Sequence, residues 1–348
     1  MTFRRTVHLW LAVVALLFCA SGLGWQEQDF ARRKVPAHTF SLPAGVPDLG
    51  ARTVIGQPRP YYFREKDTLL DIARYFDLGY NELGDAYPDM DPWLPPQGQR
   101  AVIPTVWVLP ALPSYEGLVV NIPEMRLYYF PDAGRDAVGR TVLTFPTGLG
   151  REDWPTPEAK FRVRGKTTNP TWVIPDSIKK ERIADKGWTE NFIPGGDPEN
   201  PLGSHRIELT LPLYTIHGTN NPWAVGRLVT HGCIRLYPED IEALFRLVEP
   251  GIRGQFVYQP VKVGVRGRRV FVEVHRDIYG LAGDLDAEAA RRLADAGLSA
   301  FVDRSRVFLA VEARSGVPVD VTREFRDAGD LAELQGSGRE GWAEVKED

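Results

Sequence analysis

The sequence is poor in cysteine, and this scarcity makes one thiol conspicuous. Among 348 residues only Cys19 and Cys233 carry a sulfhydryl group. If residues 1–24 are removed as a secretory signal, Cys233 stands alone, and a single thiol cannot form an internal disulfide. In an exported chain such a cysteine is either half of an intermolecular bridge or a reactive group.

The sequence also lacks a dominant charge. It has 42 Lys and Arg against 46 Asp and Glu, a net charge of −4, and no block of like charge. This balance gives no basic surface for nucleic acid, so we expect no nucleic-acid partner. Internal repeats and low-complexity tracts are absent as well. A hydrophobic content of 43% suits a packed core, and the length predicts two or three modules.

Long apolar runs are absent beyond the N-terminus. There, Arg4 and Arg5 precede an apolar stretch at residues 9–18, and small residues follow. This layout predicts a secretory signal peptide over residues 1–24. The alternative, an uncleaved inner-membrane anchor, is disfavoured because the run is short for a span of about 20 residues. A lipoprotein signal at Cys19 is disfavoured by the bulky residue before it.

Residues 25–58 are rich in Pro, Gly and Arg with weak periodicity, which predicts a linker. Residues 59–106 follow the order strand, helix, helix, strand. The first helix begins at Lys66-Asp67-Thr68, and Thr68 and Asp71 have capping-box spacing. Apolar residues then recur at helical spacing, at Leu69, Ile72, Ala73 and Phe76.

Residues 115–260 predict a mainly β domain, a sandwich or a barrel, because short alternating runs are separated by turn residues. A long structured loop is expected over residues 150–203 and an amphipathic helix over 238–248. Residues 261–348 predict an α/β extension without a recognisable chemical motif. In it we expect strands at 269–275 and 306–311 and a helix at 287–296.

Two histidines lie close to Cys233 in the sequence. His217 is in Ile216-His217-Gly218-Thr219, and His231 is in Thr230-His231-Gly232-Cys233-Ile234-Arg235. A thiol attacks a carbonyl as its thiolate, and an unperturbed cysteine titrates at about 8.5. An imidazole that accepts the proton, and a cation such as Arg235 that stabilises the anion, would activate it.

Two other chemistries compete for these residues. Cys233, His231 and His217 would supply three zinc ligands. However, a zinc site wants three or four ligands, and the nearby motif lacks a carboxylate or second thiol. A buried structural cysteine is the other alternative. The glycines Gly218 and Gly232 argue against it, because they indicate sharp turns or close approach to a ligand.

The segments His217-Gly218-Thr219 and Thr230-His231-Gly232-Cys233-Ile234-Arg235-Leu236 resemble the catalytic motif of the YkuD-type L,D-transpeptidase family. The resemblance covers roughly residues 115–260, and it includes Pro146-Thr147-Gly148 and Pro201-Leu202-Gly203. It implies a YkuD-type β-sandwich catalytic domain. In this family Cys233 would be the nucleophile and His217 the general base.

The resemblance also implies supporting roles. The Gly218 carbonyl would orient His217, and His231 would stabilise the tetrahedral intermediate. The N–H groups of Gly232 and Cys233 are candidate oxyanion donors. Arg235 would either lock the loop in a salt bridge or neutralise a carboxylate of the donor, and the sequence leaves both open. Candidate substrate contacts flank these residues, at Thr219, Thr230 and Trp223.

The implied reaction uses no metal and no organic cofactor. The thiolate would attack the tetrapeptide stem of peptidoglycan and release D-Ala, leaving a thioester. A diaminopimelate side chain, a free amino acid or a lysine of an outer-membrane lipoprotein would then take the acyl group. If water attacks instead, the activity is that of an L,D-carboxypeptidase. A non-catalytic wall-binding protein is the remaining alternative. Carbapenems would be expected to acylate Cys233.

Residues 59–106 resemble a LysM-type module, which implies binding to glycan strands. The resemblance rests on Lys66-Asp67-Thr68-Leu69-Leu70-Asp71-Ile72-Ala73, Tyr87-Pro88-Asp89-Met90-Asp91-Pro92-Trp93 and Val102-Ile103-Pro104. Tyr87 stands where the family usually has Asn, so a structural spacer is the alternative. Export together with this module predicts a periplasmic location.

Overall fold

The structure is a computed structural model that describes residues 25–31, 38–42, 53–131, 140–176, 178–179 and 190–324. The predicted signal segment, residues 1–24, lies outside the described residues. None of the helices in the described ranges is long and apolar enough to cross a membrane.

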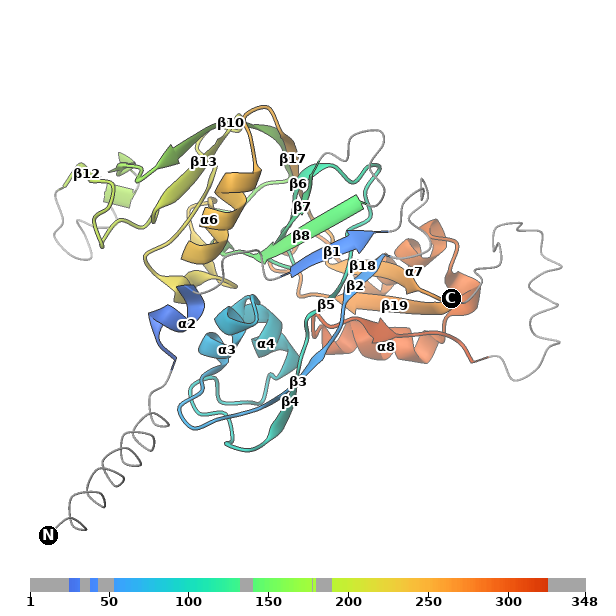
Figure 1. The fold of residues 1–348 in the computed structure, drawn as a ribbon. Helices are drawn as coiled ribbons and strands as arrows, with labels where there is room; N and C mark the ends of the chain where they lie inside the picture. Colours follow the sequence, from blue (N-terminus) through green and yellow to red (C-terminus); the bar gives the residue numbers. More distant parts are fainter. Residues whose placement is uncertain are drawn as a thin grey trace, which may run out of the picture.

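A nine-stranded sheet forms the centre of the molecule (Figure 1). In spatial order its strands are β1 (His38–Leu42), β8 (Arg140–Pro146), β7 (Arg126–Phe130), β6 (Gly117–Asn121), β17 (Arg253–Val257), β10 (Ala159–Thr168), β13 (His205–Leu209), β14 (Thr215–His217) and β16 (Ile234–Arg235). Most neighbours are antiparallel, but β6 with β17 and β14 with β16 are parallel. The prediction of a mainly β domain is confirmed.

Strands β6 and β7 of this sheet are buried on both faces. Leu118 and Val120 of β6 point into one hydrophobic core, which also contains Ile216 and Ile234 beside the predicted site. The alternate residue Val119 belongs to a second core on the opposite face. Because side chains alternate along a strand, the single sheet separates the two cores.

Helix α6 (Pro238–Leu247) covers the first core, as predicted. It begins with a proline at its first position and carries Glu239 and Asp240 in its first turn, where the helix dipole favours negative charge. Its buried face includes Ile241 and Leu244, and Figure 1 shows it lying across β10 and β13.

The linker predicted for residues 25–58 is wrong over its described parts. Residues 27–31 form helix α2 (Glu27–Ala31), and β1 pairs with β8 in a continuous antiparallel register. Strand β2 (Val54–Gly56) pairs with β5 (Val106–Val108). These strands are too short to produce a visible periodicity, and their pairing partners lie far away in the sequence.

The strand–helix–helix–strand order predicted for residues 59–106 is present as β3 (Arg59–Tyr62), α3 (Leu69–Tyr75), α4 (Tyr80–Ala86) and β4 (Arg100–Ile103), with β3 and β4 antiparallel. Thr68 caps α3, since its hydroxyl accepts from the Asp71 N–H at 3.0 Å. This unit packs on the second core and is tied to the sheet by a buried ion pair, 2.7 Å between Glu82 and Arg126.

The extension after residue 260 has its own core. Strands β18 (Val261–Arg266), β19 (Arg269–Val274) and β20 (Val319–Asp320) form a sheet, packed by α7 (Leu285–Asp295) and α8 (Arg304–Ala313). The predicted strand at 306–311 is wrong, because those residues belong to α8. A short apolar run fits either structure, and here Asp303 caps a helix by accepting from the N–H groups of Ser305 and Arg306.

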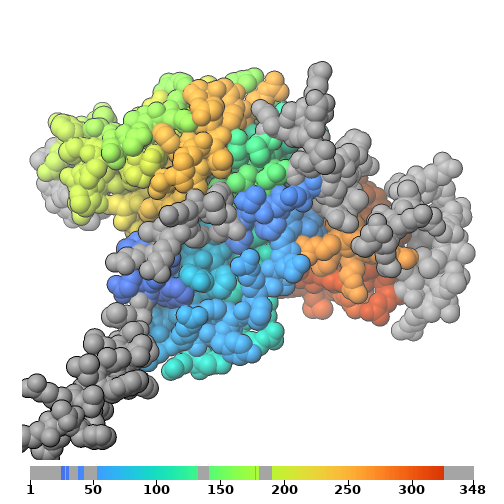
Figure 2. Space-filling view, viewed as in Figure 1, coloured from blue at the N-terminus to red at the C-terminus, as the bar shows by residue number. Residues whose placement is uncertain are grey.

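The remaining short strands are β9 (Leu149–Gly150), β11 (Trp172–Val173), β12 (Phe192–Ile193) and β15 (Leu228–Thr230). Strand β9 pairs with β15, and β11 pairs with β12. Figure 2 shows the N-terminal unit, the sheet domain and the extension packed against one another rather than separated by exposed connections.

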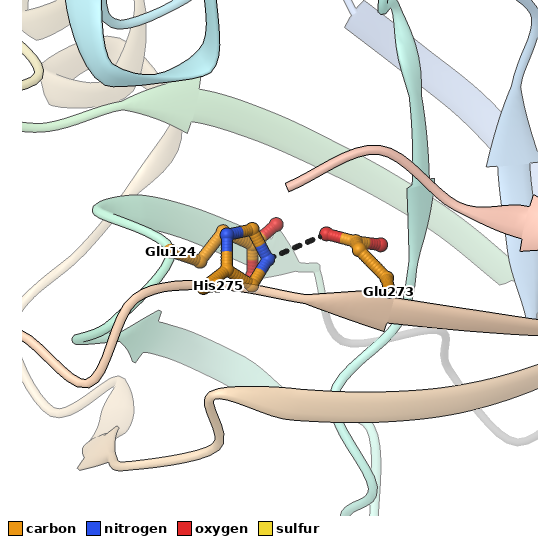
Figure 3. A group of neighbouring side chains, drawn as sticks. All are labelled: Glu124, Glu273 and His275. Atoms are coloured by element: carbon orange, nitrogen blue, oxygen red, sulfur yellow. Dashed lines mark hydrogen bonds and ion pairs between the residues drawn. The ribbon is translucent and has the colours of Figure 1, made fainter. Parts of the chain in front are cut away.

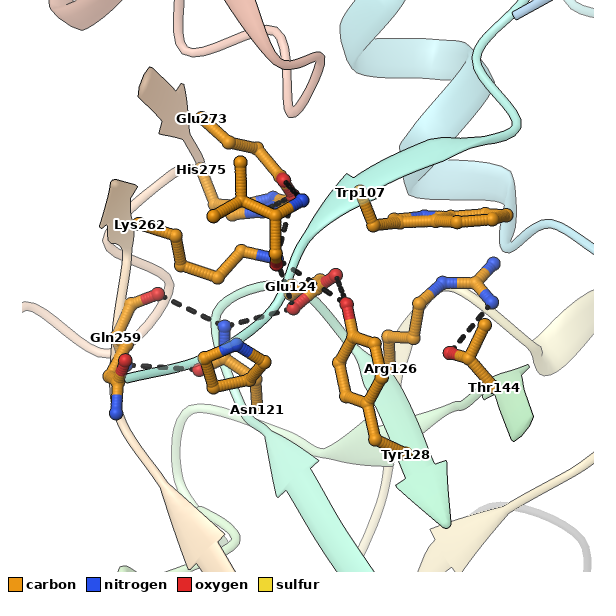
Figure 4. Close-up of polar contacts among 12 residues, drawn as sticks. Trp107, Asn121, Glu124, Arg126, Tyr128, Thr144, Gln259, Lys262, Glu273 and His275 are labelled. Atoms are coloured by element: carbon orange, nitrogen blue, oxygen red, sulfur yellow. Dashed lines mark hydrogen bonds and ion pairs between the residues drawn. The ribbon is translucent and has the colours of Figure 1, made fainter. Parts of the chain in front are cut away.

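A fully buried polar cluster joins the extension to the rest of the chain (Figure 4). The Lys262 ammonium on β18 lies 2.7 Å from a Glu124 oxygen and 2.8 Å from a Glu273 oxygen. It also donates to the carbonyl of Val108, and the N–H of Val108 donates to Glu273. His275 lies 2.7 Å from Glu273 (Figure 3). The cluster therefore connects β5, the β6–β7 turn and the β18–β19 hairpin.

Replacement of Lys262 by Met should strongly destabilise the protein. The substitution leaves the carboxylates of Glu124 and Glu273 buried without their cation, and breaking a buried pair in this way typically costs about 3–5 kcal/mol. Guanidinium unfolding measures the change in the free energy of unfolding. The exposed Lys160 provides a matched control, because Lys160→Met removes a charge without stranding a buried partner. Equal effects from the two substitutions would contradict this role for Lys262.

Candidate active site

The parallel pairing of β14 with β16 brings the sequence motifs together. In this register Ile216 lies beside Ile234, and His217 lies beside Arg235. Both isoleucines are fully buried in the first core. Since side chains alternate along a strand, His217 and Arg235 point to the opposite face, where Cys233 precedes β16.

His217 is buried and held in one orientation. Its Nδ1 lies 2.7 Å from the Gly218 carbonyl oxygen. A carbonyl can only accept, so Nδ1 carries the hydrogen and Nε2 keeps a free lone pair. Burial, and next the charge of Arg235, lower the pKa of His217 to about 3. His217 is therefore neutral at physiological pH and able to accept a proton.

The Cys233 thiol is partly exposed and contacts both β14 and the segment before it. Its Sγ lies 3.4 Å from the Leu213 carbonyl and 3.7 Å from the Thr215 hydroxyl. The sequence prediction did not include these two residues. Thr215 was detectable in principle, because it lies two positions before His217 and so shares its face of a strand.

The turn that carries Cys233 requires glycine at position 232. Gly232 has a φ of +99°, and a Cβ there would lie 2.6 Å from a ring carbon of Tyr214. Its N–H donates to the Thr230 hydroxyl at 3.2 Å. In this structure the Thr230 hydroxyl engages this N–H, one of the two predicted oxyanion donors. The Cys233 N–H remains the candidate.

Two of the predicted substrate contacts serve the backbone instead. The hydroxyl of Thr230 also donates to the Cys233 carbonyl at 2.7 Å, which closes the turn. The hydroxyl of Thr219 donates to the Asn221 carbonyl and accepts from the Asn221 N–H. Both threonines are buried, so their assignment to substrate is corrected. Trp223 is 41% exposed and stays a predicted contact.

His231 lies at the edge of the site, between an aromatic ring and a cation. Trp154 packs edge-on against its ring at 5.3 Å between centroids, and Arg151 Nη2 donates to its Nε2 at 3.3 Å. Both partners come from the turn after β9. That turn carried no motif that would have identified it from the sequence.

Arg235 lies next to the thiol, and few groups compensate its buried positive charge. Its Nε is buried without a hydrogen bond, and no carboxylate within the described residues forms a salt bridge with it. Burial lowers the pKa of Arg235, while the neighbouring Cys233 opposes that shift. Of the two roles left open by the sequence, this environment favours binding of an incoming carboxylate over a loop-locking salt bridge.

One group within the described ranges has ligand atoms close enough for a metal, all within 4.8 Å of one another: Glu124, Glu273 and His275 (Figure 3). The ammonium of Lys262 already bridges both carboxylates. Their arrangement is therefore that of a structural ion-pair cluster. The trio considered as zinc ligands, Cys233, His231 and His217, does not meet this distance condition in the described part of the chain.

Comparison with known proteins finds similarity to L,D-transpeptidases. A family model for the L,D-transpeptidase catalytic domain, YkuD, matches residues 116–264. The chain is 33% identical over 302 residues to the probable L,D-transpeptidase YcfS of Escherichia coli, covering 83% of this chain and 90% of that protein. It is 34% identical over 288 residues to the probable L,D-transpeptidase ErfK/SrfK of Salmonella typhimurium, covering 80% and 90%.

Solved structures are more distant. The L,D-transpeptidase from Mycobacterium smegmatis aligns with a TM-score of 0.31 and 18% identity, over 63% of this chain and 99% of its own. The assignment of this chain to a family therefore rests on the sequence comparisons and not on the solved structures.

Replacement of Gly232 by Ala should distort the turn that presents the thiol. The substitution adds backbone strain of about 1–3 kcal/mol and a steric conflict with Tyr214. We expect a lower melting temperature and slower alkylation of Cys233 by iodoacetamide. Gly196 is a matched control, because its φ is +83° and a Cβ there would meet nothing within 4 Å. If Gly196→Ala and Gly232→Ala behave alike, the contact with Tyr214 has no effect.

Proposed function

This chain belongs to the L,D-transpeptidase family, and we propose that it acts on peptidoglycan through a Cys233 thioester. The observation that carries this proposal is the register of β14 with β16. It sets a buried, neutral imidazole at His217 and a cation at Arg235 on the face from which the thiol of Cys233 projects. A nucleophile, a base and a charge-stabilising group are the parts that acyl transfer needs.

In the first step, Nε2 of His217 accepts the thiol proton as Sγ attacks the amide carbon before the terminal D-Ala. The Cys233 N–H donates to the oxyanion of the tetrahedral intermediate, and His231 helps to stabilise this intermediate. When the C–N bond breaks, His217 returns its proton to the leaving amine. D-Ala departs and the acyl group remains on sulfur.

In the second step an amine attacks the thioester carbon and loses its proton to His217. Collapse breaks the C–S bond, and the proton returns to the thiolate. The carbonyl of Gly218 keeps the same nitrogen of His217 available in both steps, because it holds the Nδ1 hydrogen. We propose a diaminopimelate side chain or a lipoprotein lysine as the acceptor.

Arg235 is proposed to bind a carboxylate of the donor peptide. Its positive charge can pair with an incoming carboxylate, since within the described residues no acidic side chain forms a salt bridge with it. A guanidinium that is partly desolvated binds carboxylate strongly and directionally. Hydrolysis of the thioester by water is the alternative outcome. It would use the same residues and differ only in whether an amine or water reaches the thioester.

Residues 59–106 are proposed to be a LysM-like module that binds glycan strands. Tyr62 is 61% exposed and Trp93 is 60% exposed, and exposed aromatic rings of this kind can stack on sugar rings. Tyr87, which departs from the family pattern, bridges to β4. Its hydroxyl donates to the Val102 carbonyl at 2.9 Å and accepts from the Val102 N–H at 2.6 Å. Tyr87 therefore has a structural role, and the exposed rings of Tyr62 and Trp93 remain available to stack on sugar rings.

The catalytic domain is proposed to be a two-layered β-sandwich in the periplasm. The backbones of Arg235 on β16 and Gly148 after β8 exchange hydrogen bonds of 2.8 and 2.9 Å. Strand β16 is at the far edge of the sheet order, so this contact supports a sheet that folds back on itself. The periplasmic location rests on the predicted signal segment and on the substrate.

Intact-protein mass spectrometry tests the proposed function. We expect a carbapenem to add its mass to the wild-type protein and not to Cys233→Ala. With tetrapeptide muropeptides, D-Ala should be released by the wild type only, and a lysine-ended peptide should appear in the product if lipoprotein is an acceptor. A wild type without an adduct, or an adduct that persists in Cys233→Ala, would identify a non-catalytic protein. Tripeptide products alone would identify the hydrolase.

The acylation rate should not decline between pH 7 and pH 5 through protonation of His217. Its pKa is held at about 3, so the base form persists until the pH approaches that value. Stopped-flow acylation, extended below this range to the pKa of His217, measures the acid limb. In Arg235→Gln one of the causes of the low pKa is removed, and the limb should move to higher pH. A decline centred near 6.5 in the wild type would contradict a neutral buried His217.

A further inference from the structure

Tyr279 reaches the active site from outside the matched catalytic domain. It follows β19, beyond the last matched residue, 264. Its hydroxyl donates to the Gly150 carbonyl at 2.7 Å and accepts from the Thr156 N–H at 3.2 Å. These two residues flank the turn after β9, which also supplies the neighbours of His231.

Tyr279 is itself held firmly in place. Its N–H donates to the hydroxyl of Tyr258 at 2.9 Å, and the two rings stack with centroids 6.1 Å apart. The Tyr258 hydroxyl in turn donates to Asp277, which also accepts from the N–H groups of Leu281 and Ala282. The segment therefore presents the Tyr279 hydroxyl at a defined position.

Thr156 continues this chain of contacts to the nucleophile. Its hydroxyl donates to the Gly232 carbonyl at 2.9 Å and accepts from the Gly150 N–H at 3.1 Å. Thr156 is buried, and prolines on both sides restrict its backbone. Its hydroxyl thus both donates and accepts a hydrogen bond within the protein.

The Gly232 carbonyl belongs to the same peptide unit as the Cys233 N–H. A trans peptide is planar, so its C=O and N–H point in opposite directions. A hydrogen bond that holds the carbonyl toward Thr156 consequently holds the N–H away from Thr156. Gly232 would otherwise allow this peptide plane to rotate, because glycine has few steric restrictions.

We propose that Thr156, braced by Tyr279 of the C-terminal extension, is a positioning residue that sets the direction of the Cys233 N–H as oxyanion donor. This inference rests on the proposed function. It assigns the extension a part in catalysis: the extension fixes the turn whose threonine orients the nucleophile's peptide plane. Neither Thr156 nor Tyr279 touches the reacting atoms.

If Thr156 has this role, its substitution should slow one reaction of the Cys233 thiol, acylation, and leave another, alkylation, unchanged. Acylation passes through an oxyanion and needs the oriented N–H, whereas alkylation by iodoacetamide displaces iodide at a saturated carbon and needs none. Loss of a whole oxyanion donor slows acyl transfer about 10²–10³-fold. For misdirection in Thr156→Val we expect a loss of roughly tenfold to a hundredfold. Tyr279→Phe should have a smaller effect in the same direction.

The experiment measures carbapenem acylation and iodoacetamide alkylation rates on the full chain. Thr156→Ser keeps the hydroxyl and should restore most of the acylation rate. Thr105→Val is the matched control for threonine, because Thr105 is equally buried at 2% and also donates to a backbone carbonyl, that of Gln57. Tyr115→Phe is the control for tyrosine, because its hydroxyl donates to the Pro110 carbonyl at 2.8 Å. Both controls should leave the two rates unchanged.

The outcomes separate the positioning role from its alternatives. Slower acylation with unchanged alkylation in Thr156→Val, and rescue by serine, supports it. Unchanged acylation overturns it, as does a parallel fall of both rates, which would mean that the hydroxyl acts on the thiol or on folding. A wild-type protein that is alkylated but forms no acyl-enzyme would instead contradict the proposed function.

Discussion

The active site depends on a short parallel pairing, that of β14 with β16. Its register places one buried isoleucine opposite another, and the next residue of each strand then faces the site. A one-residue shift of either strand would turn its side chains to the opposite face and remove His217 or Arg235 from the site. The fully buried Ile216 and Ile234 oppose such a shift, because it would take the isoleucine of the shifted strand out of the core. Hydrophobic packing on one face thus determines the chemistry on the other.

Charge at this site is arranged by burial more than by pairing. His217 is kept neutral by its surroundings and by Arg235, and Arg235 keeps its charge without a salt bridge among the described residues. The opposite arrangement is found in the cluster around Lys262, where each buried charge has a partner. A satisfied cluster contributes rigidity, while an unsatisfied cation is ready to bind a ligand.

The catalytic sheet is supported from both sides by segments distant in the sequence. The N-terminal unit covers its second core and is joined to it by Glu82 and Arg126. The extension is joined by Lys262, and its Tyr279 contacts the turn after β9, which Thr156 links to Gly232. The chain outside the matched domain is therefore part of the framework that holds the site.

The sequence by itself determined the family, the mainly β architecture and the two motifs that carry Cys233 and His217. These features depend on local motifs and on strand periodicity, which a single chain displays directly. Only the tertiary structure decided which hydroxyls and N–H groups are free. Thr219 and Thr230 looked available for substrate, but their hydrogen-bonding capacity is used by nearby backbone. The pairing of β1 with β8, the burial of Lys262 and the contact of Tyr279 with Gly150 join residues far apart in the sequence. Such contacts leave no local pattern, because hydrogen bonding and burial depend on which distant segments meet.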